Sequence, residues 1–271
     1  MKKELVLRDG TRVDVFSSDL HVHTNFSSDV LHITDLTPDA LAQRAIGLGL
    51  SAIALTDHLD VNSEVEGIFP PLDEEKRNRA VRKTQADYMG RLRVICGIEL
   101  GQPTQYPDVA LEMLDRGNYD FVLGSMHNLT GMPDFALMEL CGYDEDGRQA
   151  MLSDYLDEYL ALTEFPGIDS FAHLTYPLRY FAKNNLPGDL LRFPDKVRKI
   201  LKNIIARDAA LEINSSGYRN GMDCPMPDLP ILKLYRDLGG EKVTLGSDAH
   251  RIHDVGADFV PAAALLHSTG F

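Results

Sequence analysis

Short apolar runs alternate with helical patterns along most of this chain of 271 residues. The runs are nearly continuous in apolar residues, which is typical of parallel strands that are buried on both faces. We expect seven strands, at 18–21, 51–55, 92–98, 119–124, 168–172, 209–213 and 242–245. We expect helices between them at 38–47, 73–90, 107–116, 148–164, 195–207 and 228–238. This alternation predicts an α/β fold whose parallel strands form a closed or nearly closed βα barrel.

A different pattern precedes the first of these strands. The segment ELVLRDGTRVDVF alternates apolar and polar residues around Asp9-Gly10, which predicts a β-hairpin with a tight turn. We therefore expect an N-terminal hairpin extension over residues 1–16 and a catalytic barrel over residues 17–271. Two roles for the hairpin stay open: it caps the closed end of the barrel, or it mediates association between chains.

Histidines and carboxylates follow the predicted strands. His21 and His23 stand two residues apart, a spacing that points both side chains to one face of a strand. Six of the nine histidines fall at strand ends. Because the C-terminal ends of barrel strands converge on one pocket, these side chains should gather in space. The candidate ligands are His21, His23, Asp29, His58, Glu99, His127, His173, Asp248 and His250.

Imidazoles and carboxylates without thiolates form a ligand set that suits zinc, manganese or iron. Nine candidates are too many for one ion, so they favour a multinuclear centre in which a carboxylate bridges two metals, as in enzymes that cleave phosphoesters. Each histidine alone could be a hydrogen-bonded core residue, but independent core histidines have no reason to follow successive strands. The histidines at 32, 253 and 267 lie off the strand ends and are expected to be structural.

Composition narrows the class of partner. The net charge of −14 and the pI near 5.0 argue against binding of a nucleic acid polymer. No apolar run reaches the ~18 residues of a membrane span, so we expect no membrane association. The cysteines, Cys96, Cys141 and Cys224, are odd in number and scattered, which favours a cytoplasmic protein without disulfides. An anionic substrate would need local positive charge from metal or arginine.

At the level of motifs the chain resembles a known family. From Asp19 to the C-terminus it carries HVHTNFSSD, LTDH, GIELG, VLGSMHN, FAHLTYPLRY, LEINSSGYR and LGSDAH, in that order. This series resembles the PHP (polymerase and histidinol phosphatase) phosphoesterases. The tracts AHLTYPLRY and LEINSSGYR are most similar to the stand-alone histidinol-phosphate phosphatase branch. Relatives usually begin almost at the first strand, so the hairpin is a departure from the family pattern.

The resemblance implies a distorted (β/α)7 barrel with three divalent metal ions (zinc, manganese or iron). By motif, the first ion would be held by His21, His23, Glu99 and Asp248. Glu99 would bridge to a second ion, completed by His127 and His173, and a third would be held by Asp29, His58 and His250. In some relatives a histidine stands at the position of Asp29. Glu99, Asp248, His58 and His250 are the expected catalytic residues, and Arg179 and Arg219 match positions that grip the substrate phosphate.

The resemblance also implies an activity, the hydrolysis of L-histidinol phosphate to L-histidinol and phosphate in histidine biosynthesis. The loops 60–73 and 128–147 are long enough to form an acidic rim around the leaving group. Three alternatives remain. The substrate could be a nucleotide, phosphotyrosine or another small phosphomonoester; the protein could be an amidohydrolase-type hydrolase, although no lysine stands at a strand end; or it could be a non-catalytic metal-binding module. We expect a monomer or a small homo-oligomer.

Overall fold

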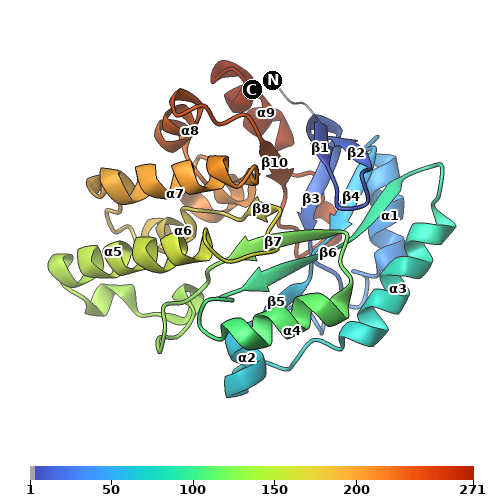
Figure 1. Ribbon diagram of the computed structural model, residues 1–271, viewed down its shortest axis with the longest axis horizontal. Helices are drawn as coiled ribbons and strands as arrows, with labels where there is room; N and C mark the ends of the chain where they lie inside the picture. The colour runs from blue at the N-terminus through green and yellow to red at the C-terminus, as the bar shows by residue number, and fades with distance from the viewer. Residues whose placement is uncertain (1–3) are drawn as a thin grey trace.

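The computed structural model describes residues 4–271 and shows a ring of parallel strands surrounded by helices (Figure 1). Within these residues the main sheet runs in the order β10-β9-β8-β7-β6-β4-β3, and every pairing along it is parallel. The strands are β3 (Ser18–Val22), β4 (Ala52–Leu55), β6 (Arg93–Gly101), β7 (Phe121–Ser125), β8 (Ser170–Phe171), β9 (Ala210–Asn214) and β10 (Val243–Gly246).

The two edges of this sheet meet just beyond their strands. Val22 forms a parallel bridge with Ala249, and the backbone N–H of His23 donates to the Ala249 carbonyl at 3.0 Å. The backbone N–H of Asp248 likewise donates to the carbonyl of His21 at 2.7 Å. The barrel is therefore nearly closed, which confirms the predicted fold class. A short extra strand, β5 (His58–Asp60), pairs with β6 outside the main order.

Six helices match those predicted, with ends that shift by up to three residues: α1 (Pro38–Gly47), α3 (Glu74–Asp87), α4 (Pro107–Gly117), α5 (Glu145–Leu162), α7 (Pro194–Ala206) and α8 (Leu229–Asp237). At the start of α1 the Thr37 hydroxyl accepts from the N–H of Ala40 at 3.2 Å, and Pro38 occupies the first turn. This is an N-terminal cap, in which a side-chain oxygen satisfies a backbone donor that the helix leaves free.

Three helices were not predicted, namely α2 (Val61–Glu66), α6 (Tyr176–Lys183) and α9 (Phe259–Ser268). The first two are too short for a 3.6-residue period to stand out. In α9, Pro261 lies in the first turn, where proline is tolerated although it usually signals a break. Shorter helical turns are Val15–Ser17, Phe135–Leu137, Leu140–Gly142, Leu190–Arg192, Tyr218–Met222 and Ile252–Asp254.

The N-terminal hairpin packs on the barrel of its own chain. Strands β1 (Glu4–Val6) and β2 (Arg12–Asp14) pair antiparallel, which confirms the hairpin; residues 1–3 of the predicted extension lie outside the described residues. Arg8 Nε donates to Asp169 Oδ2 at 2.8 Å just before β8, and Asp9 pairs with Arg93 at the start of β6. The hairpin thus covers the N-terminal ends of the strands. The boundary between residues 16 and 17 stays a prediction.

A buried ion pair supports the opposite, C-terminal end. Arg77 of α3 is fully buried, and its Nε donates to Asp57 Oδ2 at 2.7 Å. The Thr24 hydroxyl also donates to Asp57 Oδ2 at 3.0 Å. A buried guanidinium needs such a partner, because an unpaired charge in the interior is costly. The pair joins a helix to the two segments that carry His23 and His58. Along the described chain, no helix combines the length and the apolar character that crossing a bilayer requires.

Candidate metal centre

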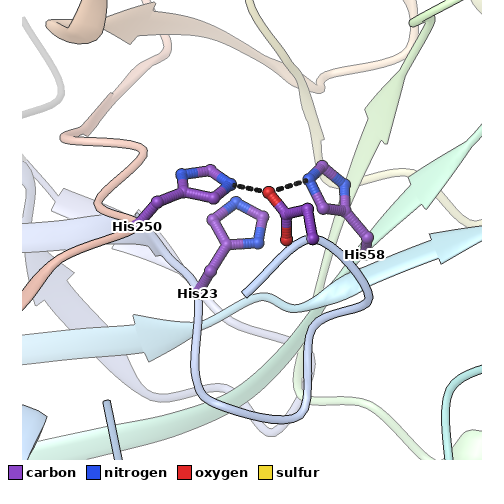
Figure 2. A group of neighbouring side chains, drawn as sticks. His23, His58 and His250 are labelled. Atoms are coloured by element: carbon purple, nitrogen blue, oxygen red, sulfur yellow. Dashed lines mark ion pairs between the residues drawn. The ribbon is translucent and has the colours of Figure 1, made fainter. Parts of the chain in front are cut away.

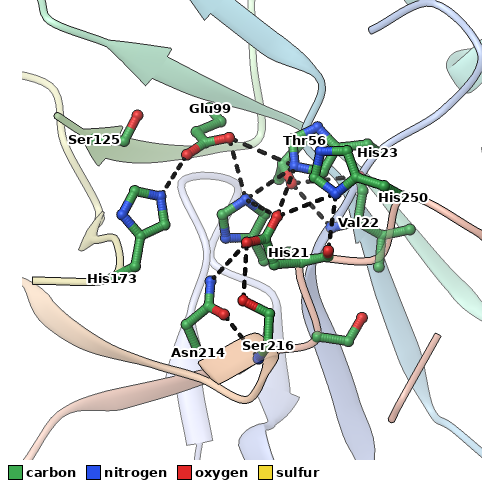
Figure 3. A network of polar contacts seen from close by, with 12 residues as sticks. His21, Val22, His23, Thr56, Glu99, Ser125, His173, Asn214, Ser216 and His250 are labelled. Atoms are coloured by element: carbon green, nitrogen blue, oxygen red, sulfur yellow. Dashed lines mark hydrogen bonds and ion pairs between the residues drawn. The ribbon is translucent and has the colours of Figure 1, made fainter. Parts of the chain in front are cut away.

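The nine predicted ligands come together at the C-terminal end of the barrel. Figure 3 shows His21, His23, Glu99, His173 and His250 among them. Each leaves a strand or follows one closely, because parallel strands in a barrel deliver their C-terminal ends to a common mouth. These residues include three clusters, and within each cluster the potential ligand atoms lie within 4.8 Å of one another. These clusters are His23, Asp29, His58 and His250; His21, His23 and Glu99; and His58, Glu99 and His127.

Glu99 lies at the centre of the site and is buried. Its Oε2 is 3.2 Å from His21 Nε2 and 3.0 Å from His58 Nδ1. Its Oε1 is 3.0 Å from His127 Nε2 and 2.8 Å from His173 Nε2. The two oxygens of one carboxylate thus face two different sets of imidazoles. This is the arrangement expected of a carboxylate that bridges two metal positions.

Asp248 forms a second carboxylate ligand position beside the first. Its Oδ1 lies 3.2 Å from His23 Nε2 and 3.7 Å from His21 Nε2. Its Oδ2 accepts from the Ser216 hydroxyl at 3.2 Å and from Asn214 Nδ2 at 3.4 Å. Asp248 has φ 53°, a left-handed conformation that non-glycine residues rarely adopt and that surrounding structure must enforce. The backbone therefore holds this carboxylate over His23.

Asp29, His23, His58 and His250 form a cluster nearer to solvent (Figure 2). His250 Nε2 is 2.8 Å from Asp29 Oδ2, and His58 Nε2 is 3.8 Å from the same oxygen. The rings of His23 and His250 stack with their centroids 4.0 Å apart. Asp29 arrives from the loop after β3, and its side chain is 41% exposed, so this cluster lies at the open side of the site.

The donor atoms fit divalent cations. His21 Nε2 and His23 Nε2 face each other at 3.1 Å, and at most one proton can lie between two such nitrogens. Within residues 4–271, buried Glu99 Oε2 and His58 Nδ1 lie 3.0 Å apart without the geometry of a hydrogen bond. Buried polar groups that converge without hydrogen bonds are costly unless a cation satisfies them. Nitrogen and oxygen donors without a thiolate suit zinc, manganese or iron.

The electrostatics of the cluster set which groups can ligate a cation directly and which must first lose a proton. Burial would raise the pKa of Glu99, but His58 and His21 hold that pKa well below its ordinary value. Burial would lower the pKa of His58, but the carboxylates of Glu99 and Asp29 outweigh it and raise that pKa to about 10. Burial, followed by the rings of His250 and His58, lowers the pKa of His23 to about 4. Glu99 is therefore ionised and His23 is neutral, so both can ligate, whereas His58 must lose a proton when a cation binds.

Sequence analysis missed two carboxylates that orient the ligands. Glu212, on β9, is fully buried; its Oε1 is 2.6 Å from His21 Nδ1, and its Oε2 accepts from the backbone N–H of His173 at 2.8 Å. Asp60 Oδ1 lies 3.1 Å from His127 Nδ1. Carboxylates behind ligating histidines fix their tautomer and ring orientation. The available signal was a single charged residue, Glu212, inside the otherwise apolar run AALEI.

A cavity of about 250 Å³ opens above the cluster. Seven of the predicted ligands line this cavity, namely Asp29, His58, Glu99, His127, His173, Asp248 and His250. The other two, His21 and His23, lie beneath it. Its wall includes Tyr176, Arg179 and Tyr180 from α6. Its rim includes Phe69 and residues 134, 136 and 137, which belong to the two loops predicted to surround the leaving group.

The two predicted phosphate-binding arginines have different surroundings. Arg179 lines the cavity, with Nη1 3.7 Å from Asp248 Oδ2 and its guanidinium over the ring of Tyr180. Arg219 is not among the lining residues of the described chain; it donates to the carbonyls of Ser247 and Asp248. The structure thus places Arg179 at the cavity and Arg219 behind Asp248. The substrate-binding role of both stays a prediction.

A nearly closed parallel barrel that gathers histidine and carboxylate ligands around a cavity at its C-terminal mouth defines the class of metal-dependent barrel enzymes. Comparison with known families refines this class, because the PHP domain model matches residues 19–216. This chain belongs to the PHP domain family. The match contains every predicted metal ligand up to His173, and Asp248 and His250 follow it.

Individual relatives cover nearly the whole chain. A protein of Clostridium acetobutylicum named "Probable histidinol-phosphatase" is 31% identical over 92% of this chain and 92% of its own length. The histidinol-phosphatase of Lactococcus lactis is 24% identical over 93% of this chain and 91% of its own length. A crystal structure of histidinol phosphate phosphatase from Lactococcus lactis, complexed with zinc, L-histidinol and phosphate, superposes with a TM-score of 0.74. It covers 94% of both chains at 23% identity, and this likeness shows the fold.

Proposed function

We propose that this protein is a metal-dependent phosphomonoesterase that hydrolyses L-histidinol phosphate to L-histidinol and phosphate. The observation that carries this function is the Glu99-centred cluster, which lies under a cavity whose wall holds Arg179. The names of the curated relatives support the substrate, as does the zinc, L-histidinol and phosphate bound in the Lactococcus lactis structure. The reaction would place the protein in histidine biosynthesis.

We further propose that the centre binds three divalent ions, in the ligand sets that the motif comparison implies. The presence of three clusters of ligand atoms supports this number; the clusters share His23, His58 and Glu99, so their membership differs in part from the implied sets. When bound, the ions supply Lewis-acid stabilisation of the phosphoryl group and a lowered pKa for water. Zinc, manganese and iron all suit the donor set.

The chain's own residues bind and orient the substrate. Arg179 presents a planar fork of donors that matches a phosphate dianion, and its stack on Tyr180 fixes the plane of that fork. Its Nε is buried without a partner among the described residues, so a phosphate oxygen would satisfy it. We propose Glu99, Asp248, His58 and His250 as the catalytic residues, because all four line the cavity. Arg219 would hold the Asp248 backbone through its bonds to the carbonyls.

The size of the cavity favours a small substrate. A volume of about 250 Å³ lies just below the range of about 300–1,000 Å³ that is typical of ligand pockets, and it suits a compact phosphate ester better than a nucleotide. The family match argues against the amidohydrolase alternative. The intact set of nine ligand side chains argues against a non-catalytic module. The expected cytoplasmic location and the state of monomer or small homo-oligomer stay predictions.

A substrate panel tests the proposal. Phosphate release from L-histidinol phosphate is compared with release from a nucleotide, phosphotyrosine and a sugar phosphate, with protein purified without chelator. We expect kcat/KM for L-histidinol phosphate to exceed the others by at least about 100-fold, which corresponds to about 2.7 kcal/mol of discrimination. A flat profile, or one that favours the nucleotide, would overturn the substrate and leave the phosphatase activity standing.

A further inference from the structure

Asp134 stands apart from the other carboxylates of the cavity. Four acidic lining residues, Asp29, Asp60, Glu99 and Asp248, contact a predicted metal ligand. Asp134 also lines the cavity, but within residues 4–271 its recorded partners are a backbone N–H of its own turn and the Tyr176 hydroxyl. The mechanism proposed for phosphate cleavage gives this negative charge no task.

The loop around Asp134 is anchored. The next residue, Phe135, is 1% exposed and packs edge-on against Tyr155 and Tyr176. The backbone N–H of Phe135 donates to the carbonyl of His127 at 3.0 Å. A buried aromatic ring tied to the backbone beside a metal ligand fixes the position of its neighbour. Asp134 is therefore held at a set distance from the metal centre, although it belongs to a loop.

One oxygen of Asp134 is occupied and the other is available. Oδ1 accepts from the N–H of Ala136 at 2.6 Å and from the Tyr176 hydroxyl at 3.1 Å. No described residue donates to Oδ2. An ionised carboxylate has about four acceptor positions, so the side chain retains capacity for a cationic donor.

A hydrogen-bond chain connects Asp134 to Arg179. The Tyr176 hydroxyl uses its one proton to donate to the Asp134 carboxylate. The hydroxyls of Tyr176 and Tyr180 lie 2.8 Å apart, so in that contact Tyr180 is the donor and Tyr176 the acceptor. Arg179 Nη2 in turn donates to the Tyr180 hydroxyl at 2.6 Å. The guanidinium and the carboxylate are thus the two ends of one chain along the wall of the cavity.

We infer that Asp134 binds the ammonium group of the leaving amino alcohol and is the residue that makes the protein prefer substrates with this group. The inference rests on the proposed function. A substrate with its phosphate at Arg179 and its ammonium at Asp134 would match both ends of the tyrosine chain. Phe69 and Leu137, which lie on the same rim, supply apolar surface for the remainder of the alcohol.

The test compares two substrates and two variants. The substrates are L-histidinol phosphate and its analogue in which hydrogen replaces the amino group. Asp134→Asn keeps the shape and the Oδ1 acceptor but removes the charge. Glu139→Gln is the matched control, because it removes a negative charge from an exposed position of the same loop.

For Asp134→Asn we expect kcat/KM for L-histidinol phosphate to fall on the order of 10- to 100-fold, mainly through KM, since a charge-assisted hydrogen bond is lost. The rate with the des-amino analogue and the inhibition constant of inorganic phosphate should each stay within about twofold, because these ligands have no ammonium group. Glu139→Gln should change none of these values. Equal losses with both substrates, or no loss with either, would overturn the inference.

A comparison of the two substrates with the wild-type protein tests the inference independently of how the variant folds. We expect wild type to prefer L-histidinol phosphate over the des-amino analogue by at least about 10-fold. Equal kcat/KM values would overturn the role of Asp134 while leaving hydrolysis of L-histidinol phosphate intact. Failure to hydrolyse either compound, with another phosphomonoester cleaved instead, would overturn the proposed function itself.

Discussion

Glu99 Oε2 and His58 Nδ1 lie 3.0 Å apart, and neither atom makes a hydrogen bond within the described residues. Leaving a buried polar atom unsatisfied costs about 1–3 kcal/mol, more when it is charged. A bound cation that displaces the proton of His58 would satisfy both atoms. The same carboxylate reaches His127 and His173 through its other oxygen, so one side chain joins the two candidate metal positions.

Replacing Glu99 with Gln should therefore disable more than one metal position. An amide offers one weak ligand oxygen in place of a bridging carboxylate, so we expect the amount of bound metal to fall. The value of kcat should drop by more than the roughly 10- to 100-fold that is typical when a residue hydrogen-bonded to a metal ligand is replaced. Metal analysis and phosphate release on the same sample measure both effects. Exposed Glu112→Gln on α4 is the control. Wild-type rates in Glu99→Gln would rule out the bridging role.

Glu212→Gln tests the orienting role of a residue that does not itself face the metal positions. The neutral amide would hold the His21 ring less firmly, and we expect metal affinity to fall by roughly 10- to 100-fold. Activity should return at higher metal concentration, which separates this effect from unfolding. A metal titration of activity, with exposed Glu241→Gln as the control, provides the measurement. An unchanged titration midpoint would show that Glu212 serves only the packing of the barrel.

The two arginines should differ in kinetic signature. Arg179→Lys loses the planar fork at the cavity, so KM for the substrate and the inhibition constant of phosphate should rise by roughly 10-fold. Arg219→Lys weakens the hold on the Asp248 backbone, so kcat should fall while KM changes by less than about twofold. Steady-state kinetics on both variants separates these results. An equal rise of KM in Arg219→Lys would place Arg219 at the phosphate, as the sequence comparison predicted.

Asp169 predicts a pH dependence of stability far from the metal centre. Burial raises the pKa of this carboxyl, against the opposing effect of Arg8. The folded state then holds the proton more tightly than the unfolded chain, whose ordinary Asp pKa is about 3.9. The contribution of Asp169 to the free energy of unfolding is therefore greatest at pH values below the unfolded-state pKa, and it is lost as pH rises through the folded-state pKa. Each unit of difference between the two pKa values corresponds to ~1.4 kcal/mol.

Asp169→Asn should remove this dependence. Urea unfolding at pH values from 4 to 7 measures the difference in free energy between wild type and variant, in which the pH effects of all other groups cancel. We expect wild type to lose stability relative to the variant as pH rises. Exposed Asp115→Asn should show no such trend. A difference that grows in favour of wild type with rising pH would mean that the Arg8 pair outweighs burial.

The fold and the gathering of the candidate ligands could be predicted because both follow from local patterns. Each strand is an apolar run, and each ligand such as His127 or His173 follows one, so barrel geometry alone brings them together. The orienting role of Glu212 depends on which face of β9 points inward, and that is set by its register against Thr244 of β10. The place of Arg219 depends on the turn at Tyr218–Met222, which no periodic pattern announces.

The sequence predicted that two loops form the rim of the cavity, but not which of their residues face it. Asp134 gains its position from the burial of Phe135 between aromatic rings contributed by α5 and α6. Such packing joins segments that are distant in the chain, and α6 itself was not recognised in the sequence. The position of Asp134 thus depends on tertiary contacts, whereas the positions of the candidate metal ligands depend on the order of strands.

Metal removal and restoration tests the central claim most directly. Protein purified without chelator is analysed for metal and assayed with L-histidinol phosphate, then stripped with a chelator and supplied in turn with zinc, manganese or iron. We expect about three divalent ions per chain, loss of phosphate release by at least about 100-fold on stripping, and recovery when one of these metals returns. Undiminished phosphate release from the stripped protein would contradict the account, as would a fully loaded protein that cleaves no phosphomonoester.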